Sequence, residues 1–534
     1  YEIHERLVGS EMCIRDSYID YLYGRGLYQD QSTAFFNGGL FSSYRGDKYD
    51  MHFIFNNDNL KMAENGGITD DRYITNPLDM AEGKKEYSAN EIPTRLSQIW
   101  NHNTSYHAFL THRYNLGFYK EKQDSVDTDS VKITQVFVPV TSFIHTLQVD
   151  LNNRKYISYD DAQNQKYFEH NYLGTDSIDK TKRTSIKNTI GIALQEGFNK
   201  WAKAGLTAFL SYEYRNFALT DTTNIPGQRI INNYKESSLS IGGELSKKQG
   251  KLLHYNILGE LAIAGEDAGQ FSVEGRGDLN LRLFGDTVRL DVNAFIKNQN
   301  PVFYFRHFQS KHYWWDNNDL SKIMRTRLEG KLSLNRWGTQ LRAGVENIKN
   351  YTYLANASIP VKDSEGNVTG FKNNAAVRQH SGNIQIFTAM LQQKLKVGIF
   401  HLDGEVAYQK SSEQDILPLP ELSAYGNLYM KFGLAKKVLQ IEMGADVRYF
   451  SKYYAPDYSP VIGQFYNQNP DDKIEIGAFP IVNVYANLHL KRTRFFIMMY
   501  HVNAGSGKSN YFLAPHYPIN PRMIKFGLSW NFFD

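Results

Sequence analysis

Hydrophobic and polar side chains alternate along many short segments of this chain. The final segment shows the pattern most clearly, with one phase made up of Ile524, Phe526, Leu528, Trp530 and Phe532. The other phase consists of Lys525, Gly527, Ser529 and Asn531. Because successive side chains of a strand point to opposite faces, the segment is predicted to be a strand with one aromatic face and one polar face. Such a strand at the extreme C-terminus is typical of outer-membrane β-barrels.

The same alternation recurs from about Ala34 onward. Clear examples are Leu439 to Tyr449, Phe271 to Leu283, and Val288 to Lys297. Further strands are predicted near 184–197, 202–217, 235–248, 251–265, 321–334, 337–350, 399–411, 422–435 and 480–491. The period of two residues indicates strands that have an apolar face and a wet face.

The segments that connect these strands alternate between short and long. Tight turns are predicted at Asn199-Lys200, Gly285-Asp286 and Asn335-Arg336, among others. Long polar connections are predicted at 152–183, 218–234, 299–320, 351–379, 452–479 and 505–522. Short turns on one rim and long loops on the other are typical of outer-membrane barrels. The predicted fold class is therefore all-β: a transmembrane antiparallel β-barrel of about 18–20 strands, with short periplasmic turns and long extracellular loops.

The strand count suggests that one strand is missing from this pattern. About 19 strands are visible, whereas bacterial single-chain barrels usually have an even number. The additional strand is expected in Tyr18 to Asp30 or upstream of it. The segment Lys120 to Ser130 is predicted to be a long, charged turn. Residues 59–104 are predicted to form a large external loop that could fold into the lumen, with an independent plug domain as the alternative.

Residues 1–17 differ from the rest of the chain. The stretch YEIHERLVGSEMCIRDS has no strand or helix period and contains the single cysteine, Cys13. It resembles a translated sequencing-adapter fragment, so it is set aside from the fold, with a natural linker as the alternative. Residues 18–534 are predicted to form a single barrel domain whose native N-terminus is truncated. We expect export by a signal peptide that this chain lacks, and location in the outer membrane of a Gram-negative cell.

Composition narrows the class further. No apolar run approaches the roughly 20 residues that a transmembrane helix needs. The mean hydropathy of −0.50 and the aromatic content of 14% both fit a barrel, in which only alternate strand residues meet lipid. The net charge of +4 comes without a basic block, so nucleic-acid binding is not indicated. One cysteine gives no disulfide framework, and no cofactor is indicated.

Charges of both signs gather on the polar faces of four predicted strands. These candidate pore-lining residues are Glu274, Arg276, Asp278, Arg282, Arg289, Asp291, Arg325, Arg327, Glu329, Glu442, Asp446 and Arg448. An Arg or Lys facing lipid at the bilayer midplane costs about 2–4 kcal/mol, which favours an inward orientation. Such charges can bias which solutes pass, or they can be polar simply because the lumen is wet. The sequence leaves both readings open.

Three local patterns suggest chemistry only weakly. The aromatic cluster around Trp314-Trp315 fits loop packing or an interface anchor, with sugar stacking as the alternative. Strand geometry puts His107 and His112 on opposite faces, which argues against a metal site. The run AGSGKS (504–509) lacks the first glycine of a phosphate-binding loop and is predicted to be an external loop. No nucleophile motif occurs, so the chain is not expected to be an enzyme.

Several segments resemble the family of "putative porins" of Bacteroidota outer membranes. They are PVTSFIHTLQ (139–148), FRHFQSKHYWWDN (305–317), GAFPIVNVYANLHLKRTRFFIMMYHVN (477–503) and the ending FGLSWNFFD. This resemblance implies an outer-membrane β-barrel with porin function, and it carries over no catalytic residues.

The leading hypothesis is passive diffusion of small hydrophilic solutes or ions through a water-filled lumen. The expected partners are outer-membrane lipid and those solutes, with no nucleic acid. Three alternatives stay open: a closed-lumen structural or binding barrel, a plug-gated active-uptake receptor truncated at its N-terminus, and an outer-membrane hydrolase. The sequence leaves open which solute passes, the conductance and the oligomeric state.

Overall fold

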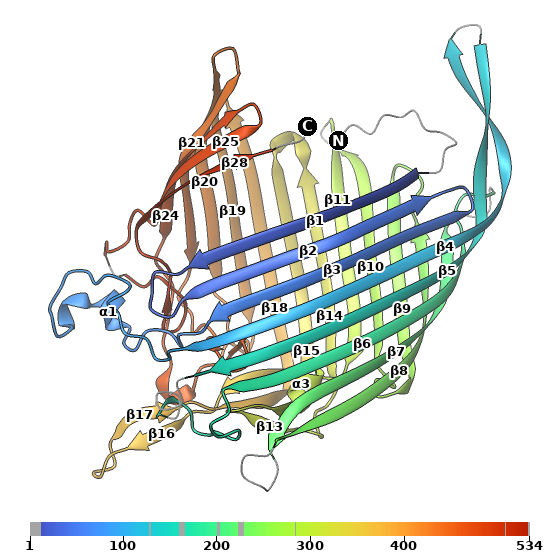
Figure 1. Ribbon diagram of the computed structural model, residues 1–534. Coiled ribbons are helices and arrows are strands. Elements are labelled where there is room, and N and C mark those ends of the chain that lie inside the picture. The colour runs from blue at the N-terminus through green and yellow to red at the C-terminus, as the bar shows by residue number, and fades with distance from the viewer. Residues whose placement is uncertain are drawn as a thin grey trace.

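The computed structural model describes residues 12–127, 130–159, 166–199, 203–222, 229–283, 285–507 and 509–531. One sheet of 20 strands dominates it, and the sheet curves into a barrel (Figure 1). Several parts of the predicted pattern lie outside the described residues: residues 1–11, the turn residue Lys200, the last three residues, including Phe532, and the positions 128–129, 160–165, 201–202, 223–228, 284 and 508 within predicted turns, strands and loops.

The barrel strands follow one another in chain order. The first ten are β1 (Met12–Arg25), β2 (Ser32–Arg45), β3 (Tyr49–Ala63), β4 (Ile99–Asp127), β5 (Ser130–Ser158), β6 (Ile178–Leu194), β7 (Gly205–Thr222), β8 (Arg229–Lys247), β9 (Leu253–Gly265) and β10 (Phe271–Leu283). The second ten are β11 (Asp286–Gln299), β14 (Ile323–Leu334), β15 (Thr339–Asn356), β18 (Ala375–Val397), β19 (Phe400–Ser411), β20 (Leu422–Leu434), β21 (Leu439–Phe450), β24 (Ile481–Leu490), β25 (Thr493–Tyr500) and β28 (Met523–Trp530).

Short elements lie in the connections between these strands. Four small hairpins are formed by β12 (His307–Gln309) with β13 (Trp314–Asp316), β16 (Ile359–Lys362) with β17 (Val368–Lys372), β22 (Asp457–Ser459) with β23 (Gln464–Tyr466), and β26 (Phe512–Ala514) with β27 (Tyr517–Pro518). The helical pieces are α1 (Arg72–Thr75), α3 (Phe303–Arg306), and the 3-10 turns η1 (Pro77–Asp79), η2 (Asn335–Trp337) and η3 (Pro470–Asp472). Among the helices in the described part of the chain, none is long and apolar enough to span a membrane.

Every barrel strand pairs antiparallel with the next one, from β1 with β2 through to β25 with β28. Within the described ranges no ladder joins β28 to β1. The count of 20 is even and confirms the predicted fold class, including its range of strand numbers. Strand β1 begins and strand β28 ends at the rim of the short turns (Figure 1).

The additional strand expected near the N-terminus is β1, but it begins earlier than predicted. Its ladder with β2 runs from Met12 opposite Arg45 to Arg25 opposite Ser32. Residues 12–17, which the sequence predicts to lie outside the fold, are therefore part of the sheet. Their lack of alternation does not prevent pairing, because backbone hydrogen bonds alone form a ladder at the edge of a sheet.

The strands have the two faces that the sequence predicts. Register partners share a face, so the ladders of β20, β21, β24, β25 and β28 place most of their aliphatic residues, and the aromatic residues of the final strand, together on the outside. Phe526 of the final strand is 81% exposed, and Leu428 and Ile497 also point outward from the barrel. A barrel with exposed apolar side chains on its outer wall fits a lipid environment.

Several predicted connections turn out to be shorter than expected. The predicted loop 152–183 shrinks because β5 runs to Ser158 and β6 begins at Ile178. Likewise β15 continues to Asn356 and β18 begins at Ala375, so 351–379 is loop only in its middle. The large external loop occupies residues 64–98 rather than 59–104. Polar residues outnumber apolar ones at the end of β5 and at the start of β6, so hydrophobic alternation could not reveal these two strand ends.

The predicted turn from Lys120 to Ser130 is wrong. Strand β4 continues to Asp127, and its pairing with β5 resumes beyond a register shift at Leu116 and Gly117. Tyr114 of β4 pairs with Tyr49, the first residue of β3. Beyond Tyr114, β4 therefore has no β3 residue to pair with. It projects from the rim of short turns as a two-stranded arm (Figure 1).

The main apolar core lies among the long loops rather than inside the barrel. One cluster joins the loops after β3, β21 and β25, through Ile68, Ile92, Ile476 and Phe512. A second joins the loops after β3, β5, β11 and β21, through Leu96, Phe168, Tyr313 and Tyr466. We call these packed loops the loop cap. The segment 64–98 packs into this shared core together with the other long loops.

Candidate functional site

The inner faces of β10, β11 and β14 carry a connected set of predicted residues. Asp278 lies 3.7 Å from Arg289, which binds Asp291 at 2.7 Å. Lys331 lies 3.1 Å from Asp291 on the other side. His254 of β9 extends the row to Asp278 at 2.9 Å. The ladders place these side chains on the face opposite the aliphatic residues, so they point into the barrel.

Further predicted residues on the same strands form neighbouring pairs. Arg325 contacts Glu346 at 2.6 Å, and Arg327 pairs with Glu329. Glu274 binds Lys297 at 2.6 Å and lies 3.9 Å from Arg276. The partners Glu346, Lys297 and Lys331 were not among the predicted residues, although each follows the inward phase of its strand.

The structure places the β21 residues on another part of the wall. Glu442 lies 3.5 Å from Lys431, and Asp446 accepts a hydrogen bond of 2.9 Å from Asn483. Arg448 lies over the ring of Tyr425 at 5.8 Å. Among the ion pairs of the described residues, none joins this set to the β10–β14 set, and none involves Arg282.

Water reaches these inward charges unevenly. The side chain of Arg276 is 75% exposed and that of Arg289 is 50% exposed, whereas the carboxylates of Asp291, Glu329 and Glu346 are mostly covered. A side-chain-filled barrel interior would bury such guanidinium groups, so their exposure indicates wet space beside the wall. The charge that faces this space is mainly positive, because the acidic partners lie closer to the strands.

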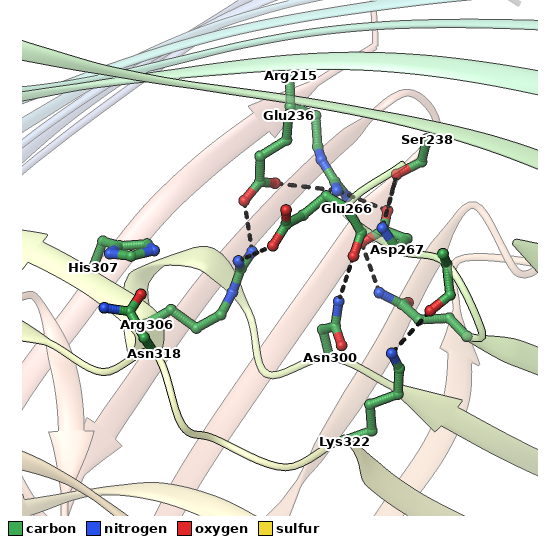
Figure 2. Close-up of polar contacts among 12 residues, drawn as sticks. Arg215, Glu236, Ser238, Glu266, Asp267, Asn300, Arg306, His307, Asn318 and Lys322 are labelled. Carbon is green, nitrogen blue, oxygen red and sulfur yellow. Dashed lines mark hydrogen bonds and ion pairs between the residues drawn. The ribbon is translucent and has the colours of Figure 1, made fainter. Parts of the chain in front are cut away.

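A buried ion-pair cluster attaches the loop between β11 and β14 to the wall. Arg306 of α3 donates to Glu236 of β8 and to Glu266, each at 2.7 Å (Figure 2). Arg215 of β7 also contacts Glu236, at 3.1 Å, and binds Asp267 at 2.7 Å. Because these four strands and loops are far apart in the chain, no local sequence pattern indicates this cluster.

Two further contacts fix the ends of the same loop. Asn300 donates to the backbone oxygen of Glu266 at 3.1 Å, and Lys322 donates to that of Ala268 at 2.9 Å (Figure 2). Burial opposes ionisation of Asp267, but hydrogen bonds from Arg215 and Ser238 outweigh it and hold the pKa of that carboxyl below its ordinary value. The Asp267 carboxyl thus favours the charged state that pairs with Arg215.

A second buried polar group lies within the loop cap. Arg154 donates to Asn101 Oδ1 at 2.5 Å and to the backbone oxygen of Val461. Glu64 accepts hydrogen bonds from Asn101 at 2.6 Å and from Tyr458 at 2.9 Å. Burial is the larger effect and raises the pKa of Glu64 to about 7. These contacts join the loop after β3 to the loop after β21.

The weaker sequence patterns have clear positions in the structure. Tyr313 and Trp315 are buried in the loop cap, which supports loop packing, and Trp314 alone of the three is exposed. His107 contacts Asp150 at 2.6 Å, while His112 contacts His145 at 2.8 Å on the opposite face of the strand, as predicted. Within the residues that the structure describes, no group of acidic, histidine or cysteine side chains is arranged to hold a metal ion.

Comparison with known proteins identifies one family. A family model described as "Putative porin" matches residues 17–534, nearly the whole chain. No curated protein sequence matches the chain.

Solved structures of similar shape are named as siderophore receptors and as a copper transporter. The ferric enterobactin receptor PfeA of Pseudomonas aeruginosa, solved as a mutant, is 11% identical and matches over 94% of this chain and 69% of its own, with a TM-score of 0.57. The siderophore receptor PirA of Acinetobacter baumannii is 8% identical over 94% of this chain and 71% of its own, also with a TM-score of 0.57. The copper transporter OprC is 10% identical over 96% and 75%, with a TM-score of 0.56. At these identities the likeness shows the barrel fold alone.

Proposed function

The chain belongs to the putative porin family, and on that premise we propose that it forms a non-enzymatic pore of the outer membrane. Small hydrophilic solutes would diffuse through its lumen down their own gradients. The proposed diffusion needs no energy source and no bound cofactor.

One observation supports a conducting lumen more than any other. The inner faces of the strands carry charged side chains that water reaches, and the outer faces of the same strands are apolar. Charged side chains need water or a partner, so a wet interior explains why they lie there. The twelve predicted residues would then line the path of the solutes.

The arrangement of the charges also indicates an ion preference. The guanidinium groups of Arg276, Arg289 and Arg325 extend into the lumen, whereas their acidic partners lie closer to the strands. A passing anion therefore meets favourable charge sooner than a passing cation does. We expect a moderate anion preference, together with a size limit set by the loop cap at the outer mouth.

Recordings from planar bilayers test this function directly. Purified protein should give stepwise currents without added ligand, and vesicles that contain it should swell in solutions of small sugars. The reversal potential in a KCl gradient gives the sign of the preferred ion. Protein that inserts as a folded barrel but passes neither ions nor sugars would contradict the proposal.

The solved structures favour a second candidate. Those neighbours are named as receptors for ferric siderophores and as a copper transporter, and they are longer than this chain. In such a receptor the lumen would stay closed until a ligand binds, so it would show no steady current in the bilayer experiment. High-affinity binding of a ligand by a non-conducting barrel would support this candidate over the pore. The same result would equally support a binding barrel with a closed lumen.

A further inference from the structure

A large cavity lies between the loop cap and the inner wall of the barrel. Its volume is about 780 Å³, in the upper part of the range of about 300–1,000 Å³ that is usual for ligand pockets. The wall contributes residues of β4, β5, β6 and β15, and the long loops after β11, β19 and β21 contribute the rest of the lining. A solute that enters from the loop side would meet this cavity.

Aromatic rings supply much of the lining. Tyr351 and Tyr353 on β15 lie nearly parallel, with their ring centres 5.9 Å apart. Phe308 and Trp315 stack on the loop after β11, with ring centres 4.8 Å apart. Phe465 adds a ring that is 60% exposed. Flat rings of this kind pack against flat, weakly polar faces of a ligand.

Polar groups without a protein partner lie among these rings. Asn103 and Ser105 on β4, Asn152 on β5 and Gln464 on the cap line the cavity. Among the described residues, the side chains of these four form no hydrogen bond with another side chain or with the backbone. Amide groups can both donate and accept, which suits hydroxyl groups that also do both.

The cavity offers no unpaired charge. Among the described residues that line it, Arg154 is the only charged one, and its guanidinium already donates to Asn101 and to the backbone oxygen of Val461, close to Glu64 and Asp179. An ionic ligand, or a free peptide with its two charged termini, would lose hydration there without gaining a counter-charge. A neutral ligand avoids that loss.

We propose that this cavity is a binding site for a neutral oligosaccharide. The apolar faces of its sugar rings would pack on the aromatic side chains, and its hydroxyl groups would hydrogen-bond to Asn103, Asn152 and Gln464. The proposal rests on the pore function and names its class of solute, because the cavity lies at the outer mouth of the lumen.

Calorimetric titration of the whole chain in detergent tests the site. The probes are maltohexaose and cellohexaose, with hexagalacturonic acid as the charged counterpart and a hexa-alanine peptide as the alternative ligand. At least one neutral probe should bind, and the charged probe and the peptide should bind at least about tenfold more weakly. Equal binding of the acid or the peptide would overturn the proposal, and so would the absence of binding by both neutral probes.

Two variants and two matched controls assign the binding to the cavity. Asn152→Ala removes an amide that has no partner, and Phe465→Ala removes a largely exposed ring, so neither change should disturb folding. Each should weaken binding of the neutral probe about five- to tenfold. Asn293→Ala on the inner wall of β11 and Tyr454→Ala on the same loop as Phe465 lie outside the cavity and should leave binding unchanged. Equal loss in the controls would contradict the assignment.

Bilayer recordings separate this inference from the pore function. If the channel conducts but no oligosaccharide binds or blocks it, the inference fails and the pore stands. If the oligosaccharide binds through Asn152 and Phe465 but no current flows, the site stands and the passive pore fails.

Discussion

Replacing Arg306 with alanine should release the loop between β11 and β14 while leaving the barrel intact. Arg306 is the one member of the ion-pair cluster that comes from this loop, and it reaches two carboxylates of the wall region at 2.7 Å each (Figure 2). Asn300 and Lys322 still hold the two ends of the loop (Figure 2), and Lys311 and Tyr313 still hold its middle in the loop cap. The part of the loop around Arg306 should therefore open more often, and its residues should become accessible to solvent.

The size of the effect follows from burial. The side chain of Arg306 is 14% exposed and that of Glu236 is 7% exposed, so the pair is well shielded. Removing one partner of a buried pair costs about 3–5 kcal/mol. Arg215 stays beside Glu236 at 3.1 Å and limits the loss, so we expect about 2–3 kcal/mol. Since each 1.4 kcal/mol is a factor of ten, the open state should become roughly 30- to 150-fold more populated.

Native-state hydrogen exchange measures this population residue by residue. Amides of the segment 300–322 should exchange faster in the variant, with no change in β10, β11 or β14. Limited proteolysis should cut the same segment first. The matched control is Arg72→Ala, which removes an exposed contact with Asp70 in another loop and should change exchange only there.

Two results would refute this reasoning. Unchanged exchange in 300–322 would mean that Arg306 does not hold the loop. Faster exchange throughout the barrel would mean that the cluster stabilises the whole fold rather than one loop.

Three further predictions concern charge and the loop cap. Reversing both Arg276 and Arg282 to Glu should shift the permeability ratio toward cations by about three- to tenfold, read from reversal potentials in a KCl gradient; an unchanged ratio would place these residues away from the ion path. Because the folded pKa of Glu64 is raised from 4.5 to about 7, its contribution to cap stability is fully present below pH 4.5 and is lost as pH rises through about 7, by about 3 kcal/mol in total. Protection factors, which are corrected for the intrinsic pH dependence of amide exchange, should thus be higher at pH 5 than at pH 8 in residues 64–98, and Glu64→Gln should remove that difference. A variant that keeps it would assign the pH dependence to another group. Tyr313→Phe should lower the free energy of cap unfolding by about 1–2 kcal/mol, because the buried hydroxyl bonds to Asn373 and Ser459. Thermal melting followed by fluorescence would detect this loss. An unchanged melting temperature would argue that neither bond stabilises the cap.

The barrel could be predicted because its strands satisfy a local rule. Phe271 to Leu283 was predicted from alternation alone and is β10 in the structure. The inward phase of β10, β11, β14 and β21 likewise follows from side-chain parity, since each ladder carries it to the next strand. Which charges pair is harder to predict, because the register sets it: Arg325 meets Glu346 only through the alignment of β14 with β15.

The loop cap could not be predicted for a different reason. Its contacts join residues that no periodic pattern relates, such as Tyr458 with Glu64 or Trp315 with the backbone of Tyr304. The sequence around Trp314-Trp315 favours loop packing, but it does not indicate which residues these side chains contact. The end of β4 was missed because polar residues predominate from Lys120 to Asp127, where the hairpin leaves the membrane-facing wall.

The loop cap has a consequence for the order in which the molecule assembles. Tyr458 and Glu64 are 394 residues apart in the chain, and Arg154 and Val461 are 307 apart, so the cap can close only after most strands have been joined. Contacts of such large sequence separation form slowly, because a long stretch of chain must first lose its freedom. We therefore expect a late folding intermediate with a complete ladder of strands and an open outer mouth. Newly inserted molecules would leak for a short time and then tighten, and a slow fall in conductance after insertion would be the record of that final step.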